Sequence, residues 1–343
     1  MKKRLFLSCL VLILAGCVSL DREHIKSHSK KPMRPPVLNQ TGYEYVETPI
    51  AMRLIRQTSR DSEHYTSTFF SFPSYGENNQ EGNLVTGEYL ASREPGKKKL
   101  VIVLPIWGAS DFPPSLMAKE LTDWNHWLDT NVLYLDGRVD LFDWPAMERS
   151  LTESVLLREI ESSVARVKNT VIDIRRLIDW AESRPEIDSR RIGIVGFSIS
   201  AVVASVASAV EPRIKVGVSV MGGGNFHEIM GFCSASDVLA ARQAILKRFG
   251  WSAKELEAKV EPASRLINPV RYGAGINPGR FLIIESADDQ YIPHSARDDL
   301  WEAFGRPERL MLKYNHRMAF ATMTPALLNF TDRTITNFFR EKL

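Results

Sequence analysis

Apolar and polar positions along the first half of the chain predict strands of two kinds. Residues 65–72 and 83–92 alternate well enough to be antiparallel edge strands. Residues 98–108 contain a continuous apolar run that starts at Leu100, which is typical of a strand buried on both faces. A helix is expected near 115–128, and residues 131–137 predict the next strand.

The longest helical pattern covers residues 153–183. Its apolar residues recur at intervals of three or four, namely Leu156, Ile160, Val164, Val167, Val171, Ile174, Ile178 and Ala181. Such a stripe is expected to lie on a sheet, and Pro185 ends the helix. A coiled-coil partner helix is the alternative interpretation of the stripe.

In the second half, strands are expected at 192–195, 216–224, 281–289 and 309–314, with helical segments between them. This alternation predicts an α/β fold with a mostly parallel central sheet covered on both faces by helices.

The interval 226–275 is too long for an ordinary crossover, and its helical segments around 236–249 and 252–260 predict a small helical cap insertion. Met230, Phe232 and Trp251 are candidates for lining a substrate pocket there, with burial in the core of the cap as the alternative.

The first residues have the three parts of a signal peptide: Lys2, Lys3 and Arg4, an apolar run, and then small residues. Leu14-Ala15-Gly16-Cys17 resembles a bacterial lipobox, which implies lipidation of Cys17; an ordinary signal peptide is the alternative. Val18 after the cysteine resembles lipoproteins sorted to the outer membrane. We therefore expect a signal peptide at 1–16, a lipidated Cys17 and flexible tether at 17–43, and one domain at 44–343. The protein is then anchored in the cell envelope by its lipid, facing the periplasm.

Composition narrows the function classes. Three of the 44 basic residues lie in the expected signal peptide, which leaves 41 against 41 acidic residues. With no basic stripe, this balance argues against nucleic-acid binding. Only Cys233 remains as a free thiol after processing, so no intrachain disulfide is expected.

The segment RIGIVGFSIS, residues 191–200, predicts a strand, a sharp turn at Gly196–Ser200 and a following helix of small residues. This layout resembles the nucleophile elbow of the α/β-hydrolases, whose pattern is G-x-S-x-G. It identifies Ser198 as the candidate nucleophile. Ser200 replaces the second glycine, a mild change because the position requires a tiny residue.

A serine nucleophile needs a base, an acid that orients the base, and oxyanion donors. In this fold the acid and then the histidine follow the serine along the chain. ESADDQYIP, residues 285–293, resembles the acid turn of the family and selects Asp289, with Asp288 as the alternative. His316 follows the last predicted strand, where the family has its catalytic histidine, and is the candidate base. The resemblance also implies an oxyanion hole formed by the amides of Ile199 and, in LPIWG, Trp107.

Residues 177–198 resemble dienelactone-hydrolase and acetyl-xylan-esterase-like enzymes, and the wider resemblance covers about residues 95–343. It implies a serine hydrolase, most simply a carboxylic-ester hydrolase acting on a small-molecule ester without metal or organic cofactor. A peptidase of the same fold and an inactive hydrolase-like interaction module are the alternatives, because one fold hosts many functions.

Overall fold

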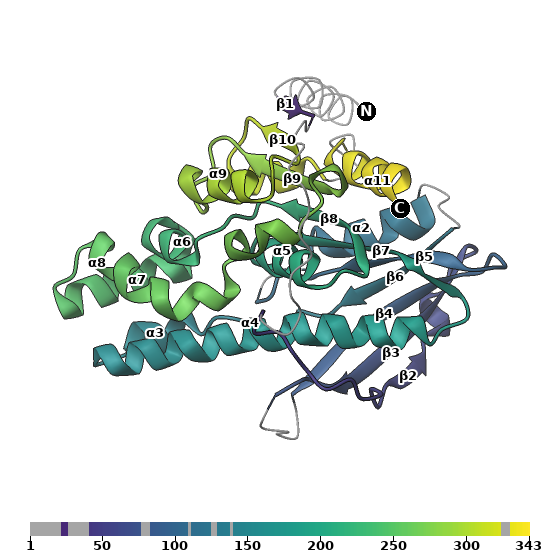
Figure 1. The fold of residues 1–343 in the computed structure, drawn as a ribbon, viewed down its shortest axis with the longest axis horizontal. Helices are drawn as coiled ribbons and strands as arrows, with labels where there is room; N and C mark the ends of the chain where they lie inside the picture. Colours follow the sequence, from purple (N-terminus) through teal and green to yellow (C-terminus); the bar gives the residue numbers. More distant parts are fainter. Residues whose placement is uncertain are drawn as a thin grey trace, which may run out of the picture.

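The computed structural model describes residues 22–26, 41–76, 83–108, 111–124, 129–137, 140–323 and 330–343. In this part of the chain, ten strands form one sheet with helices on both faces (Figure 1). The strands are β1 (Arg22–Ile25), β2 (Arg53–Arg56), β3 (Tyr65–Pro73), β4 (Leu84–Ser92), β5 (Lys98–Val103), β6 (Thr130–Leu135), β7 (Ile187–Phe197), β8 (Ile214–Val220), β9 (Phe281–Ser286) and β10 (Glu308–Leu312).

The strand order is β1-β10-β9-β8-β7-β5-β6-β4-β3-β2. From β10 to β6 every neighbouring pair is parallel, whereas β1, β4, β3 and β2 pair antiparallel at the two edges. The predicted fold class, a mostly parallel α/β sheet with antiparallel strands at 65–72 and 83–92, is confirmed.

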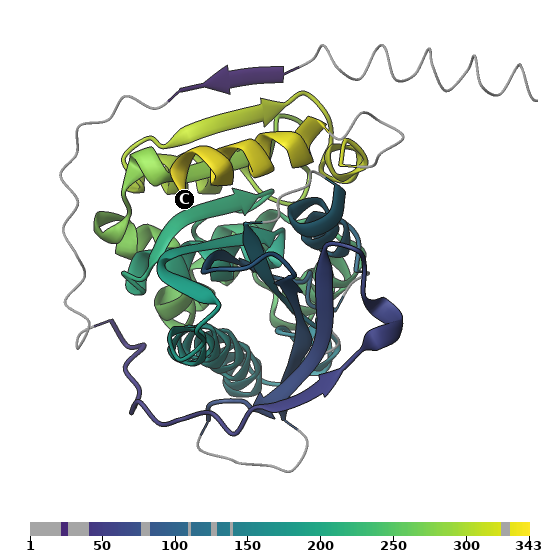
Figure 2. The ribbon, with the colours of Figure 1, turned by 90° about the vertical axis from the view of Figure 1, so that its right-hand side faces the viewer.

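Successive side chains of a strand point to opposite faces, so the apolar run of β5 supplies two cores. Leu100 and Ile102 join one core, and Val101 and Val103 join the other. The first face is covered by α4 (Glu153–Glu182) and α5 (Ile199–Val210), and the second by α2 (Pro114–Lys119), the π-helical turn η3 (Glu120–Trp124), α10 (His316–Ala321) and α11 (Phe330–Lys342). Figure 2 shows α4 and α11 on opposite sides of the twisted sheet.

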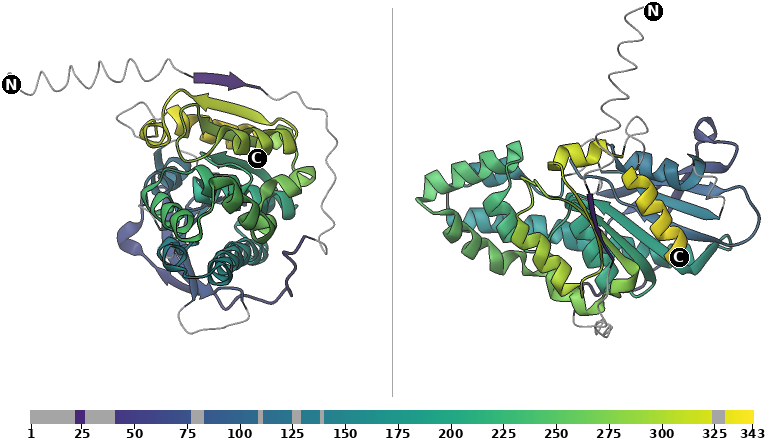
Figure 3. Two further views of the ribbon diagram at one scale, coloured as in Figure 1. Left: turned by 90° about the vertical axis from the view of Figure 1, so that its left-hand side faces the viewer. Right: turned by 90° about the horizontal axis from the view of Figure 1, so that it is seen from above.

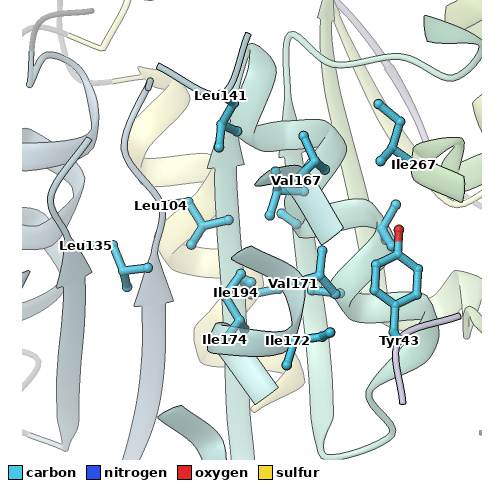
Figure 4. Packing of buried hydrophobic residues seen from close by; sticks show 14 of the residues in the cluster. Tyr43, Leu104, Leu135, Leu141, Val167, Val171, Ile172, Ile174, Ile194 and Ile267 are labelled. Atoms are coloured by element: carbon cyan, nitrogen blue, oxygen red, sulfur yellow. The ribbon is translucent and has the colours of Figure 1, made fainter. Parts of the chain in front are cut away.

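Helix α4 confirms the long amphipathic pattern. All eight residues of its apolar stripe are buried, and they pack on the sheet within one core cluster. Figure 4 shows Val167, Val171 and Ile174 of this cluster close to Ile194 of β7. The stripe is therefore covered from within the domain. Thr152 caps the helix by accepting a hydrogen bond from Val155 N at 3.3 Å.

The insertion after β8 forms α6 (Phe226–Phe232), α7 (Ser236–Phe249), α8 (Ala253–Ser264) and the 3₁₀ segments η4 (Arg265–Ile267) and η5 (Pro269–Gly275). Helix α7 packs on α3 (Trp144–Arg149), and α8 packs on α6 and α4. Figure 3 shows α6, α7 and α8 gathered at one end of the molecule. Among the described residues, no single helix has the length and apolar character to cross a membrane; only the bent pair α6–α7 meets both criteria, with an 86° break.

The remaining short helices serve the sheet. Helix α9 (His294–Ala303) and Phe304 cover Phe281 and Ile283 of β9. The 3₁₀ segment η2 (Thr58–Arg60) lies between β2 and β3, and η6 (Pro278–Arg280) directly precedes β9.

The folded domain extends further toward the amino terminus than expected. Tyr43, assigned to the flexible tether, is fully buried in the core (Figure 4), and its hydroxyl donates to Leu266 O at 2.7 Å. Residues Arg22–Ile25 pair with β10, and His24 Nε2 lies 2.6 Å from Glu308 Oε1. These two segments of the predicted tether at 17–43 therefore pack on the domain. The polar residues Arg22–Ile25 do so because any residue other than proline can pair through its backbone at a sheet edge. The signal peptide and Cys17 lie outside the described residues.

Candidate active site

Ser198 occupies a tight turn between β7 and α5, with φ 54° and ψ −117°. A left-handed backbone is rare for residues other than glycine and is often found at functional sites. The turn is tight because Gly196 lies against the backbone of α5: a Cβ on Gly196 would stand 2.1 Å from Ser200 O. The predicted elbow geometry is therefore present, with Ser198 at the carboxyl end of a central strand.

Asp289 and His316 form a buried pair at the same end of the sheet. His316 Nδ1 lies 2.8 Å from Asp289 Oδ2, and the second carboxylate oxygen accepts hydrogen bonds from Tyr291 N at 2.8 Å and Ile292 N at 3.0 Å. His316 is 2% exposed and Asp289 7% exposed, whereas Asp288 is exposed. Of the two candidate acids, the structure brings Asp289 to the histidine.

Ser198 and His316 line one cavity of about 500 Å³. The size is typical of a small-molecule site. Among the described residues, no hydrogen bond joins Ser198 Oγ to His316, although both side chains line the same cavity. Contacts of this kind often tighten only when substrate binds.

The two predicted oxyanion residues, Trp107 and Ile199, line the same cavity. Ile199 is the first residue of α5, so its N–H has no acceptor within the helix. Trp107 lies in the loop after β5, which is fixed by a hydrogen bond from Gly108 N to Gly137 O at 3.0 Å.

Buried charges support the loop that carries Asp289. Arg309 Nε donates to Glu285 Oε1 at 2.8 Å, and Arg297 Nη1 donates to Ser286 O at 2.5 Å. Burial raises the pKa of Glu285, and the guanidinium of Arg309 acts in the opposite direction. This ion cluster joins the end of β9 to the start of β10 and so supports the start of the acid loop.

Gln290, which the sequence did not single out, connects the acid loop to two other segments. Its side-chain oxygen lies 3.4 Å from His316 N, and its carbonyl accepts hydrogen bonds from Ser234 N at 3.1 Å and Ser234 Oγ at 2.9 Å. Ser234 lies between α6 and α7, so the cap is joined directly to the loop between the acid and the histidine.

The three residues predicted to line the substrate pocket do not lie in the cavity wall. Met230 is fully buried in the core, Phe232 is 47% exposed, and Trp251 stacks on Phe249 with ring centroids 4.6 Å apart. Phe226 and Ile229, three residues apart on α6, line the cavity instead. Met230, one turn after Phe226, packs into the core of the domain, and Phe232 lies at the exposed end of the helix.

An aromatic wall faces the cavity from two insertions. Phe226 of α6 stacks on Phe142 with centroids 4.6 Å apart, and Phe142 stacks on Trp144 at 5.3 Å. Phe142 belongs to the segment between β6 and α3, and Trp144 is the first residue of α3; no role was predicted for either residue from the sequence. The only available signal was the cluster of aromatic residues after a strand end.

Other cysteine and histidine side chains are poorer nucleophiles or bases, or lie elsewhere. Cys233 lines the cavity, but burial raises the pKa of its thiol, which favours the unreactive neutral form. His294 is exposed and lies 2.9 Å from Asp298 Oδ2. His126 lies outside the described residues.

Solved structures with a similar fold include esterases and a peptidase. An acetyl xylan esterase from Paenibacillus sp. R4 superposes with a TM-score of 0.65 at 14% identity, covering 89% of this chain and 92% of that chain. Acetyl xylan esterase 1 from Thermoanaerobacterium sp. gives 0.56 at 17% identity, covering 88% and 96%. Acylaminoacyl peptidase from Pyrococcus horikoshii gives 0.56 at 17% identity, covering 82% of this chain but 42% of the peptidase.

Similarity at the level of sequence covers a smaller part of the chain than similarity of structure. No family model matches the chain. Two uncharacterized proteins from the CDC 1551 and H37Rv strains of Mycobacterium tuberculosis are 26% identical over 152 residues, 44% of this chain. The chain spans about a third of the length of these curated relatives, since the match covers 33% of each. The sheet order and the solved structures together show that the chain has the α/β-hydrolase fold.

Proposed function

We propose that the protein is a serine hydrolase that cleaves carboxylic esters, with Ser198 as nucleophile, His316 as base and Asp289 as the orienting acid. The observation that carries the proposal is a buried His316–Asp289 pair facing the cavity that contains the strained Ser198. Similarity of fold to esterases is consistent with it but does not assign the reaction.

The geometry suggests a standard acyl transfer. Asp289 binds His316 Nδ1 and so leaves Nε2 to accept the proton of Ser198 Oγ as this oxygen attacks the ester carbonyl. The amides of Trp107 and Ile199 stabilise the negative charge that forms on the carbonyl oxygen. His316 then donates the proton to the departing alcohol, and water hydrolyses the acyl-enzyme by the same steps.

A fluorophosphonate probe and a panel of acyl esters test this proposal on the purified protein. We expect the probe to label Ser198, and Ser198→Ala and His316→Ala to lower ester turnover on the order of a thousandfold or more. Asp289→Asn should lose far more activity than Asp288→Asn. Cys233→Ser is the control for the rival nucleophile and should keep both labelling and turnover.

The outcome also separates the alternatives. Cleavage of acylated peptides in preference to esters would favour a peptidase, which the similarity to acylaminoacyl peptidase makes worth testing. A folded wild-type protein that neither reacts with the probe nor cleaves any ester would contradict the proposal and favour a noncatalytic interaction module.

We further propose that Cys17 carries the lipid anchor and holds the protein at the cell envelope, in the outer membrane facing the periplasm. The support is the lipobox-like Leu14-Ala15-Gly16-Cys17 with Val18. Wild-type protein should fractionate with membranes and carry an acyl mass on Cys17, and Cys17→Ser should abolish the modification. Fully water-soluble wild-type protein without that mass would exclude the anchor.

A further inference from the structure

The register of β1 fixes the direction in which the chain leaves the domain. β1 is antiparallel to β10, with Arg22 opposite Leu312 and Ile25 opposite Arg309. The start of β1 therefore lies beside the end of β10, as Figure 2 shows for the purple strand and its neighbour. In an open α/β sheet, ligands bind beyond the carboxyl ends of the parallel strands.

The end of β10 is joined to the acid loop. Leu312 O accepts a hydrogen bond from Ala287 N at 2.8 Å, and Tyr314 O accepts one from Asp288 N at 3.2 Å. Arg22 also stacks its guanidinium over the ring of Phe330, 3.6 Å from the centroid. The chain that precedes β1 therefore reaches the domain at the carboxyl ends of the parallel strands, where Asp289 and His316 also lie.

Little chain separates this point from the proposed lipid. Cys17 lies five residues before Arg22, which spans at most roughly 18 Å even when fully extended. An anchor this short holds the carboxyl ends of the parallel strands, and with them the candidate site, close to the membrane. The domain cannot then tumble freely.

The rim of the cavity has the surface that such a position requires. Phe112, Phe232 and Met318 are large apolar side chains exposed by 37%, 47% and 47%. Phe112 lines the cavity itself, and Phe232 and Met318 adjoin the cavity-lining residues Cys233 and Arg317. Gln290 contacts both Ser234 and His316, which places the segments of Phe232 and Met318 near each other.

We infer that this rim rests on the lipid surface, so that the cavity takes amphiphilic acyl esters from the membrane rather than freely dissolved ones. The inference rests on the proposed hydrolase activity and on the proposed lipid on Cys17. Apolar side chains gain by burial at the level of the acyl chains, and the exposed guanidinium of Arg317 suits anionic headgroups.

The orientation can be tested without catalysis. In a Cys233→Ser background, a bimane fluorophore is placed at Phe232→Cys or Met318→Cys in the full lipidated chain. The control position is Leu54→Cys, a 43% exposed residue on β2, the edge strand at the other side of the sheet from β1. The proteins are reconstituted in phosphatidylethanolamine–phosphatidylglycerol vesicles whose acyl chains carry bromine, a quencher.

We expect strong quenching at 232 and 318, several times that at 54, and its loss in Cys17→Ser. Quenching at 232 and 318 no greater than at 54, or wild-type protein without an acyl mass on Cys17, would overturn the inferred orientation.

The substrate part is tested by lengthening the anchor. An insert of about 30 Gly and Ser residues between Ser19 and Leu20 adds a root-mean-square length of roughly 30 Å. We expect the ratio of hydrolysis of a vesicle-embedded long-chain ester to that of a water-soluble ester to fall about tenfold; an unchanged ratio would overturn the membrane substrate. Inactivity of wild type on both esters would instead contradict the proposed function, while the quenching pattern still decides the orientation.

Discussion

Ser200 takes over the position where the α/β-hydrolase pattern has a second glycine, and its side chain stabilises the elbow. Its Oγ accepts a hydrogen bond from Phe197 N at 2.6 Å and donates one to Phe197 O at 2.9 Å. Ser200 is fully buried. The departure from the pattern therefore supplies two hydrogen bonds at the residue preceding the strained Ser198.

We predict that Ser200→Ala destabilises the protein by about 1–3 kcal/mol, because it leaves buried backbone groups at Phe197 with one partner fewer. Urea unfolding measures the change in the free energy of unfolding. The matched control is Ser205→Ala on the same helix, where the buried hydroxyl has no hydrogen-bond partner in the part of the chain described and its removal should be close to neutral. Equal effects of the two changes would contradict this role of Ser200.

The individual site residues were predictable to different degrees. Ser198, Asp289 and His316 each have a local signal: a short motif or a position just after an apolar strand. Gln290 has none, because its role comes from contacts with Ser234 and His316, which lie far from it in the sequence.

At the scale of elements, α6 is the part of the cap that contacts the site. Ile229 lines the cavity, so Ile229→Ala enlarges it. We predict that this variant shifts the preference toward esters with longer acyl chains by about tenfold in relative kcat/KM, because each methylene accepted in such a pocket is worth about 1–3 kcal/mol. Leu246→Ala, a partly buried residue of α7 in the same cap but outside the cavity wall, is the control. Kinetics with esters of graded acyl length decide; identical profiles for both variants would contradict the assignment.

The link between the cap and the acid loop predicts a positioning role for Gln290. Gln290→Ala removes the side-chain oxygen that accepts a hydrogen bond from His316 N. Such a hydrogen bond contributes about 0.5–1.5 kcal/mol, so we expect Ser198 of the variant to react roughly two- to tenfold more slowly with a fluorophosphonate. The rate of labelling, measured at constant folded fraction, checks this. Ser234→Ala, which keeps the backbone bond to Gln290, should have a smaller effect; an unchanged labelling rate in Gln290→Ala would exclude the role.

For the whole molecule, one buried carboxyl group links stability to pH. Asp332 on α11 is fully buried, and neither of its carboxylate oxygens has a hydrogen-bond partner among the described residues. Burial, together with the negative charge of Glu120, raises its pKa to about 8 from 3.8. The folded state therefore binds a proton that the unfolded state has released, so stability falls as the pH rises from about 4 to about 8.

We predict that Asp332→Asn removes this part of the pH dependence, because the amide stays neutral. The variant should be more stable than wild type above pH 8, by an amount on the order of kcal/mol, and the difference should shrink toward pH 5. Urea unfolding of both proteins between pH 5 and 9 measures it. Parallel stability curves over that range would show that Asp332 is already ionised in the folded protein.

The sequence by itself determined the order and type of most elements. The apolar periods at 98–108 and 153–183 and the G-x-S motif depend on neighbours within a few residues, so they predict β5, α4 and the elbow directly. Even α7, at 236–249, was located to the residue. A period reveals that a face is buried, but it does not say against what.

Only the tertiary structure decided the contacts between distant segments. The short polar β1 becomes a strand because β10 offers a free edge, and Tyr43 joins the core because α4 and the cap leave space for it. The cavity wall combines Phe142, Trp144 and Phe226 from two insertions. Packing of α6 against its neighbours decides that Phe226 and Ile229 line the cavity while Met230 packs into the core. These outcomes depend on packing between elements, whose free energy no local pattern contains.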